Sequence, residues 1–413
     1  MDLLRFITAG SVDDGKSTLI GRLLFDSKSI LIDQLEALEK LSRNKEDGEI
    51  DLALLTDGLR AEREQGITID VAYKYFSTTK RKFIIADAPG HIQYTRNMIT
   101  GASNANLIII LVDARHGVAE QTRRHSIIAS LLKIPHVVVA VNKMDLVDYS
   151  QDVFNNIIID YAEMAKNLGL PDVTYIPISA LKGDNIVEKS NAIPWYDGKA
   201  LLDVLENVHV ENDVNLTHAR FPVQYVIRPQ TEELHDYRGY AGKIISGVYK
   251  KGDDIVVLPQ GLTSKIKSLE VAGKELDIAF ANESIVMQLE DDIDISRGDM
   301  ILKNENQPRL EQEIEVLLCW MDSKPLLQGN KYLLQINSRR VRSSIKQIEY
   351  KLDVNTLEKN HEVKQASLND IVRVTIKVSS PVPVDSYNDL QANGGAILID
   401  ETSNVTVGAC MIQ

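Results

Sequence analysis

Two different hydrophobic patterns divide the chain near Asn207. Before that residue, short continuous apolar runs alternate with longer segments whose apolar positions have helical spacing. The apolar runs are "KFIIADAPG", "LIIILVDA", "HVVVAVNKMD" and "VTYIPISA". Such runs are typical of parallel strands buried on both faces, whereas "EQTRRHSIIASLLK" and "QDVFNNIIIDYAEMAKNLG" have the spacing of helices. The alternation predicts a doubly wound α/β domain with a mostly parallel sheet.

After "VNLTHARFPV" the helical spacing stops, and only short strand patterns follow. A first set contains "FPVQYVI", "YAGKIISGVY", "DDIVVLP" and "ESIVMQLE". A second set contains "IEVLLCW", "KYLLQIN", "DIVRVTIKV" and "AILIDE". Glycines and charged turns separate these strands, which predicts two small all-β barrels. We therefore expect three domains, at residues 1–213, 214–306 and 307–413.

Composition narrows the class of protein. The 413 residues are 44% apolar and 25% charged, as in globular proteins with a sizeable core. The formal net charge of -13 argues against sequence-independent binding of nucleic acid, which needs a basic surface. No secretion signal is visible, and the run "LIIILV" is far shorter than the roughly 20 residues that cross a bilayer. We expect a cytoplasmic protein in which Cys319 and Cys410 are buried thiols.

A phosphate-binding loop follows the first apolar run. "GSVDDGKS", Gly10 to Ser17, fits the P-loop pattern G-x4-G-K-[ST] and stands between the strand-like "FITA" and the helical "STLIGRLL". Its backbone N–H groups would point at phosphate oxygens, Lys16 would reach the β- and γ-phosphates, and the Ser17 hydroxyl would bind Mg²⁺. The alternative is a strand-to-helix turn that binds nothing. The predicted nucleotide contacts are Gly10, Ser11, Val12, Asp13, Asp14, Gly15, Lys16, Ser17 and Thr18.

The motif Asn142-Lys143-x-Asp145 predicts which base is bound. The Asp145 carboxylate can accept hydrogen bonds from guanine N1–H and from the exocyclic amine, and adenine offers neither donor on that edge. Asn142 would hold the loop and guanine N7, and the Lys143 stem would cover one face of the base. Alone, the motif is more often a polar loop, but here it ends a strand, where α/β sheets bind ligands. In "SALKG" the Ala180 N–H would meet guanine O6, and the predicted contacts there are Ser179, Ala180 and Leu181.

"DAPGH" and "EQGITID" supply the remaining groups for phosphate chemistry. Asp87 would hold Mg²⁺ through water, and the Gly90 N–H would contact the γ-phosphate. Thr68 would complete the metal shell only when that phosphate is present, so its loop would act as a switch. His91 would orient the attacking water, although a lone histidine is more often structural. The catalytic candidates are therefore His91, Lys16 and Thr68. Three other histidines lie in no such motif, and we expect structural roles for them: His116, His125 and His136.

Together these motifs resemble the translation-factor class of GTPases, in which a G domain precedes two β-barrels and of which elongation factor Tu is the familiar member. Other features differ from the elongation factors, because Ser11 and Asp14 stand where those proteins usually carry histidines. Several long segments resemble the large, GTP-binding subunits of bacterial sulfate adenylyltransferase. They are "DAPGHIQYTRNMITGASNANL", "VQYVIRP", "RGYAGKIISG", "EDDIDISRGDM", "DVNTLE" and "ILIDETSNVTVGACMI". This resemblance covers nearly the whole chain.

The resemblance implies a subunit of a heteromeric ATP sulfurylase that uses GTP and Mg²⁺, in a heterodimer or a larger assembly. A smaller partner subunit would make adenylyl sulfate and pyrophosphate from ATP and sulfate, and GTP hydrolysis on this chain would drive that reaction. We expect no nucleic acid or membrane partner. Nothing here resembles an adenylyl-transfer site, and no second P-loop pattern suggests a fused adenylyl-sulfate kinase. Two alternatives stay open: a translation-type factor that binds aminoacyl-tRNA, and a regulatory switch without a coupled reaction.

One long segment between the P-loop helix and Thr68 is left over. Leu31, Leu35, Leu38 and Leu41 recur at helical spacing, which predicts an amphipathic helix. The segment "DGLRAEREQG", Asp57 to Gly66, has two interpretations. Its charges could simply face water, or GTP could order it through Thr68 so that it contacts the small subunit.

Overall fold

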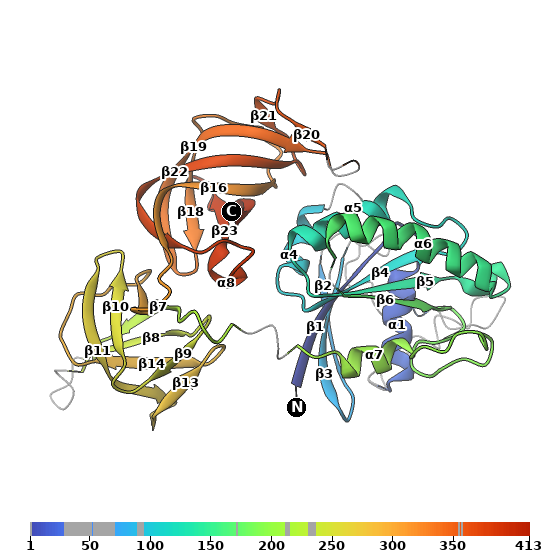
Figure 1. The fold of residues 1–413 in the computed structure, drawn as a ribbon, viewed down its shortest axis with the longest axis horizontal. Coiled ribbons are helices and arrows are strands. Elements are labelled where there is room, and N and C mark those ends of the chain that lie inside the picture. The colour runs from blue at the N-terminus through green and yellow to red at the C-terminus, as the bar shows by residue number, and fades with distance from the viewer. Residues whose placement is uncertain are drawn as a thin grey trace. The chain divides into compact units, whose positions relative to one another are not determined.

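The computed structural model divides the chain into two compact units, residues 1–210 and 211–413 (Figure 1). It describes residues 2–28, 52, 71–88, 95–170, 172–210, 215–229, 237–353, 356 and 358–413. Three groups of predictions lie outside the described residues: the roles of Thr68, Gly90 and His91, the helix with Leu31 to Leu41, and the segment Asp57 to Gly66. Within the described part, no helix is both long enough and apolar enough to span a membrane.

A six-stranded sheet forms the centre of the first unit, in the order β2-β3-β1-β4-β5-β6. Its strands are β1 (Asp2–Ala9), β2 (Ala72–Ser77), β3 (Arg81–Asp87), β4 (Leu107–Asp113), β5 (His136–Asn142) and β6 (Asp172–Pro177). Every neighbouring pair is parallel except β2 with β3. The predicted α/β fold is confirmed. The prediction that "VTYIPISA" is buried on both faces is wrong, because β6 is an edge strand and Val173, Thr174 and Tyr175 are half-buried.

Helices cover this sheet on both faces (Figure 1). They are α1 (Lys16–Asp26), α4 (Thr95–Ala102), α5 (Glu120–Leu131), α6 (Gln151–Leu168), α7 (Leu201–Asn207) and the short 3-10 helix η3 (Met144–Val147). Apolar side chains of α1 and α7 share one core with Phe6 of β1 and Phe83 of β3. The bounds of α6 follow from its sequence, because the Ser150 hydroxyl accepts a hydrogen bond from the Val153 N–H and Gly169 takes the left-handed conformation that ends the helix.

Two closed antiparallel barrels make up the second unit. The strands of the first barrel sheet are β7 (Phe221–Ile227), β8 (Gly239–Lys243), β10 (Asp254–Leu258), β11 (Leu262–Val271), β12 (Lys274–Leu276), β14 (Ser284–Leu289) and β15 (Met300–Lys303), with β9 (Val248–Lys250) and β13 (Ile278–Phe280) paired beside it. The strands of the second are β16 (Arg309–Trp320), β18 (Lys331–Ile336), β19 (Arg339–Leu352), β20 (Lys359–Asn360), β22 (Ile371–Val384), β23 (Gly395–Ile399) and β24 (Thr406–Ile412), with β17 (Leu326–Leu327) and β21 (Gln365–Ala366) as a separate pair and α8 (Gln391–Gly394) before β23.

Additional pairings between β10 and β11 and between β18 and β19 close the two sheets. Each barrel has its own apolar core, as the alternation of apolar and polar residues predicts. The segment "YAGKIISGVY" is predicted as one strand, but the structure has two strands there, β8 and β9, with a break between them. Cys319 and Cys410 are free and buried, as predicted.

A buried ion pair joins the two barrels within the second unit. Arg220, which precedes β7, is 1% exposed, and its guanidinium donates to both carboxylate oxygens of Asp385 at 2.9 and 2.8 Å. The Asn393 amide donates to the same carboxylate at 2.8 Å. Since Asp385 follows the long strand β22, this cluster fixes the start of one barrel to the end of a strand in the other.

Candidate nucleotide-binding site

The loop between β1 and α1 has the conformation that a phosphate cradle requires. Gly15, at the N-terminus of α1, has a φ of +92°, and a Cβ there would lie 2.5 Å from the Asn142 side-chain nitrogen. Only glycine fits both conditions. The Asp14 carboxylate accepts a hydrogen bond from the Ser11 N–H, which closes the turn. Burial raises the pKa of Asp14, and the Ser11 hydrogen bond and the Lys16 charge oppose that effect.

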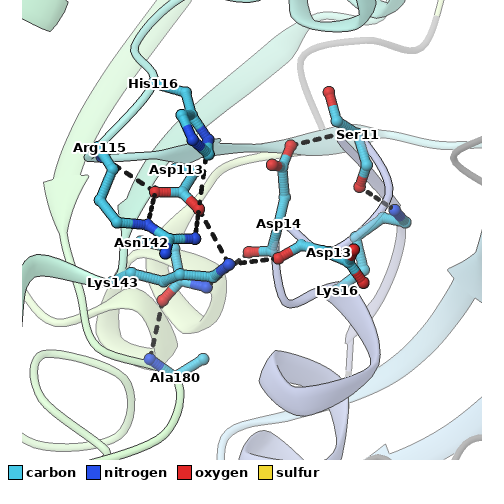
Figure 2. A network of polar contacts seen from close by, with 10 residues as sticks. All are labelled: Ser11, Asp13, Asp14, Lys16, Asp113, Arg115, His116, Asn142, Lys143 and Ala180. Carbon is cyan, nitrogen blue, oxygen red and sulfur yellow. Dashed lines mark hydrogen bonds and ion pairs between the residues drawn. The ribbon is translucent and has the colours of Figure 1, made fainter. Parts of the chain in front are cut away.

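Lys16 lies inside this loop (Figure 2). Its Nζ donates to the carbonyl oxygens of Gly10 at 3.0 Å and of Ser11 at 2.7 Å, and the residue is 7% exposed. Burial lowers the pKa of Lys16, whereas the charges of Asp87 and Asp14 raise it. The ammonium group is therefore held by backbone carbonyls of the loop in which the sequence predicts the β- and γ-phosphates.

Asp87 ends β3 and is buried, at 1% exposure. The Thr8 hydroxyl of β1 donates to its carboxylate at 3.2 Å, so the two neighbouring parallel strands fix its position. Because Asp87 pairs with Thr8 and the P-loop begins two residues after Thr8, this carboxylate lies near the start of the P-loop. A buried carboxylate and the Ser17 hydroxyl at this edge are oxygen ligands of the kind that Mg²⁺ prefers, so the residues described fit that ion.

Asn142 joins the loops that would surround the base. It ends β5 and is 1% exposed. Its side-chain nitrogen donates to the Asp14 carbonyl at 2.7 Å, and its side-chain oxygen accepts from the Ala180 N–H at 2.9 Å. Asn142 therefore holds the P-loop and the loop around Ala180 together, and its contact with guanine N7 stays a prediction. The predicted contact of the Ala180 N–H with guanine O6 stays a prediction, and that N–H would have to turn from Asn142 or be shared with it.

Lys143 lies at the centre of a polar network (Figure 2). The residue takes the left-handed conformation, with a φ of +63°, and its Nζ donates to the Asp13 carbonyl of the P-loop. The same Nζ lies 2.9 Å from the Asp113 carboxylate. Its side chain therefore extends from β5 to the P-loop, which is the course needed to cover a base held between them.

Sequence reasoning missed Asp113 and Arg115. Asp113 ends β4 and is 3% exposed, and Arg115 donates to both of its carboxylate oxygens at 3.0 and 2.7 Å. Burial opposes ionisation of Asp113, but the hydrogen bonds from Arg115 and Lys143 outweigh it, so the pKa of Asp113 lies well below its ordinary value. The available signal was an acidic residue directly after the continuous apolar run "LIIILV".

The remaining base-site residues lie nearby. Asp145 is in η3 and half-buried, and the preceding Met144 anchors that turn, because it is fully buried and its N–H donates to the Ile178 carbonyl at 3.2 Å. Ser179 closes the next loop by accepting hydrogen bonds from the N–H groups of Gly183 and Asp184. The structure thus brings Asn142 and Lys143 against the P-loop and bonds Ala180 to Asn142, and the roles of Thr68, Gly90 and His91 stay predictions.

The three histidines expected to be structural have different surroundings. His125 is buried on α5, and burial and the nearby charges of Lys16 and Arg124 lower its pKa to about 3. His136 contacts Asp172 at 3.0 Å, at the amino ends of β5 and β6 and thus at the opposite edge from the P-loop. His116 is exposed, with its ring 3.7 Å from Asp113.

Comparison with known proteins agrees with this geometry. The model of the elongation factor Tu GTP binding domain matches residues 1–211, and that of the GTP-eEF1A C-terminal domain-like family matches residues 313–413. "Sulfate adenylyltransferase subunit 1" of Bacteroides fragilis is 54% identical over 413 residues, 100% of this chain and 86% of the relative. "Bifunctional enzyme CysN/CysC" of Mycobacterium tuberculosis is 53% identical over 411 residues, 99% of this chain and 67% of the relative. The solved structure of Sup35 complexed with GDP is a more distant likeness, with 22% identity, 100% and 93% of the two chains covered, and a TM-score of 0.45.

These features define a GTPase of the translation-factor type: a P-loop bonded to Asn142, two barrels after the α/β domain, and a match of residues 1–211 to the elongation factor Tu GTP binding domain. Within that class, the chain belongs to the sulfate adenylyltransferase subunit 1 family, since several members match it along its whole length at more than half identity.

Proposed function

We propose that this chain binds and hydrolyses GTP as the energy-supplying subunit of a heteromeric sulfate adenylyltransferase. The observation that carries the proposal is the position of Asn142, which bonds to the P-loop and to the loop around Ala180, so that the two motifs expected to hold the phosphates and the base lie together. The names of the relatives, sulfate adenylyltransferase subunit 1, support the coupled reaction. Cytoplasmic location is part of the proposal.

Each of the site residues has a separate role in the binding and hydrolysis of GTP. Asp145 accepts hydrogen bonds from guanine N1–H and the exocyclic amine, while Lys143 covers one face of the base. Lys16 leaves the carbonyl oxygens of its own loop and neutralises charge that develops on the β- and γ-phosphates. When bound between Ser17, Thr68 and Asp87, Mg²⁺ would supply further neutralisation of the phosphate oxygens. His91 orients the attacking water, and the Gly90 N–H contacts the γ-phosphate.

Hydrolysis on this chain is useful only if a partner senses it. Formation of adenylyl sulfate and pyrophosphate from ATP and sulfate is strongly unfavourable, because it makes a sulfate–phosphate anhydride. Coupling requires a conformational state that both the GTP site and the partner's site favour or disfavour. We assign the adenylyl transfer to the small subunit and none of its ligands to this chain. The assembly is a heterodimer or a group of heterodimers.

A translation-type factor is the second candidate, because the matching family model is that of elongation factor Tu. The net charge of -13 and the full-length relatives favour the first candidate. One reconstitution separates the two. The chain is combined with a sulfate adenylyltransferase small subunit, and adenylyl sulfate is measured with ATP and sulfate, with and without GTP. Copurification and strong GTP stimulation are expected. Absence of both, together with binding of charged tRNA, would overturn the proposal.

A further inference from the structure

Arg22 lies outside the nucleotide-binding motifs, yet it contacts one of the base loops. The residue is on α1, and its Nε donates to the Ala180 carbonyl at 3.3 Å while a terminal nitrogen donates to the Leu181 carbonyl. These partners are 158 and 159 residues away in sequence. The carboxylate of Asp26, one turn later on α1, lies 3.6 Å from the guanidinium. The Arg22 side chain is only 20% exposed, so its contacts are partly shielded from water.

These contacts determine how the loop presents its backbone. A peptide unit is planar, with its N–H directed opposite to its carbonyl. When Arg22 holds the Ala180 and Leu181 carbonyls, it also fixes the N–H groups of Leu181 and Lys182. The Lys182 N–H donates to the Ser179 hydroxyl at 3.2 Å, so the donor that Arg22 orients toward the base is the Leu181 N–H, next to the Ala180 N–H that Asn142 holds. The loop lies against α1 here, because a Cβ on Gly183 would be in van der Waals contact with Asp26 at 3.6 Å and Arg22 at 3.7 Å, and Gly183 has a φ of +87°. Ser179 fixes the other side of the loop by accepting the Gly183 N–H at 2.8 Å.

Helix α1 contributes residues to both parts of the nucleotide site. Lys16 is the first residue of α1, and Arg22 lies less than two turns later on this single rigid element. Helix α1 therefore fixes the position of Lys16, at the phosphate site, relative to the loop around Ala180, where the base is expected to bind. Asn142 makes a second connection between the P-loop and this loop, through the Ala180 N–H rather than its carbonyl.

We infer that Arg22 is a positioning residue for guanine specificity, which holds the loop of Ser179–Gly183 so that its backbone donors meet the oxygen at position 6 of the base. The inference rests on the proposed binding of GTP and assigns Arg22 no contact with the nucleotide. Loss of the guanidinium frees two carbonyl oxygens and lets the loop turn. Contacts with base atoms on the Asp145 side are unaffected, because η3 and β5 hold that residue independently.

The test compares three nucleotides on the full chain. GTP is the reference, 6-thio-GTP replaces the oxygen at position 6 by a weaker acceptor, and inosine triphosphate lacks only the exocyclic amine that faces Asp145. Dissociation constants are measured by calorimetry for the wild type, Arg22→Ala and Arg22→Lys. Arg123→Ala is the control, because Arg123 is an exposed arginine on α5 of the same unit.

For Arg22→Ala we expect GTP affinity to fall about tenfold, the loss of one or two charge-assisted hydrogen bonds. The preference of the wild type for GTP over 6-thio-GTP should shrink toward equality, while its preference for GTP over inosine triphosphate stays unchanged. The GTP affinity of Arg22→Lys should lie between those of the wild type and Arg22→Ala. Arg123→Ala should bind all three nucleotides as the wild type does. Equal weakening of all three nucleotides, or unchanged GTP affinity, would overturn the inference. A wild type that binds none of the three nucleotides would instead overturn the proposed function.

Discussion

At the scale of single residues, the nucleotide site consists of side chains that hold backbone loops together. Asn142 bonds to two loops, Lys143 connects β5 with the P-loop, and Asp113 holds Lys143 from β4. Because Asn142 and Asp113 are buried and all three side chains have partners, the loops already have a defined arrangement, and less ordering is needed when a nucleotide binds. Asp145, which is half-buried, would then make the contacts that select the base.

Replacement of Asp145 tests base selection directly. In Asp145→Asn an amide donor would face the guanine donors, so hydrogen-bonding groups would be left unpaired. The free energy of GTP binding should become less favourable by about 2–4 kcal/mol. Xanthosine triphosphate should gain relative to GTP, since its oxygen at position 2 is an acceptor. Titrations with both nucleotides give the answer, and an unchanged affinity for GTP would contradict the role of Asp145.

His91→Ala separates binding from turnover. GTP affinity should change little, because the proposed role of the ring is to orient water and not to hold the nucleotide. Hydrolysis should slow by one or more orders of magnitude, as expected when the water-positioning residue of a phosphoryl-transfer site is lost. Single-turnover hydrolysis measures the rate, and a titration in parallel measures affinity. Full turnover by the variant would remove His91 from the mechanism.

At the scale of elements, α5 carries a pH-sensitive residue inside the first unit. Burial lowers the pKa of His125 to about 3 from an ordinary value of 6.5. Between these two values the unfolded chain binds a proton that the folded protein does not bind. The free energy of unfolding therefore falls as the pH decreases through this window, and the loss is about 2 kcal/mol from pH 6.5 to pH 5.

His125→Gln should remove this contribution. Its free energy of unfolding should depend less on pH between 6.5 and 5 than that of the wild type, even if the variant is less stable at pH 7. Urea denaturation of the first-unit transition at several pH values provides the comparison. His209→Gln, at an exposed position of the same unit, should keep the wild-type pH dependence. If the free energy of unfolding of His125→Gln changes with pH in the same way as that of the wild type, His125 is not the source of the pH dependence.

Elements that depend on local sequence were predictable, whereas contacts between residues far apart in the chain were not. The P-loop, α5, α6 and most strands were predictable, because each depends on local spacing or on a short motif. The contacts of Arg22 with Ala180 and of Arg220 with Asp385 were not, since they join residues 158 and 165 positions apart. The antiparallel strand β2 was missed because "AYKYFS" is polar and aromatic along an edge and resembles no buried run.

At the scale of the whole molecule, the Arg220–Asp385 pair is expected to make the two barrels unfold together. Arg220→Ala would leave the Asp385 carboxylate, whose side chain is 11% exposed, without its counter-charge. Loss of one partner of such a buried pair costs about 3–5 kcal/mol. Arg342→Ala is the control, since that side chain is 82% exposed and its pair with Glu401 should contribute less than about 1 kcal/mol. Urea denaturation monitored by fluorescence of Trp320, with Trp195 of the first unit replaced by phenylalanine in every variant, gives both values. Equal stabilities would contradict the expectation.

We claim that GTP bound at this site drives sulfate activation on a partner. The most direct measurement follows adenylyl sulfate formation by the reconstituted complex, with wild type or Asp145→Asn, and with GTP or xanthosine triphosphate. We predict that the wild-type complex responds to GTP alone and that the variant complex responds to xanthosine triphosphate instead, because the same carboxylate selects the base and the coupled nucleotide. Adenylyl sulfate formation that is the same in all four combinations would contradict the claim.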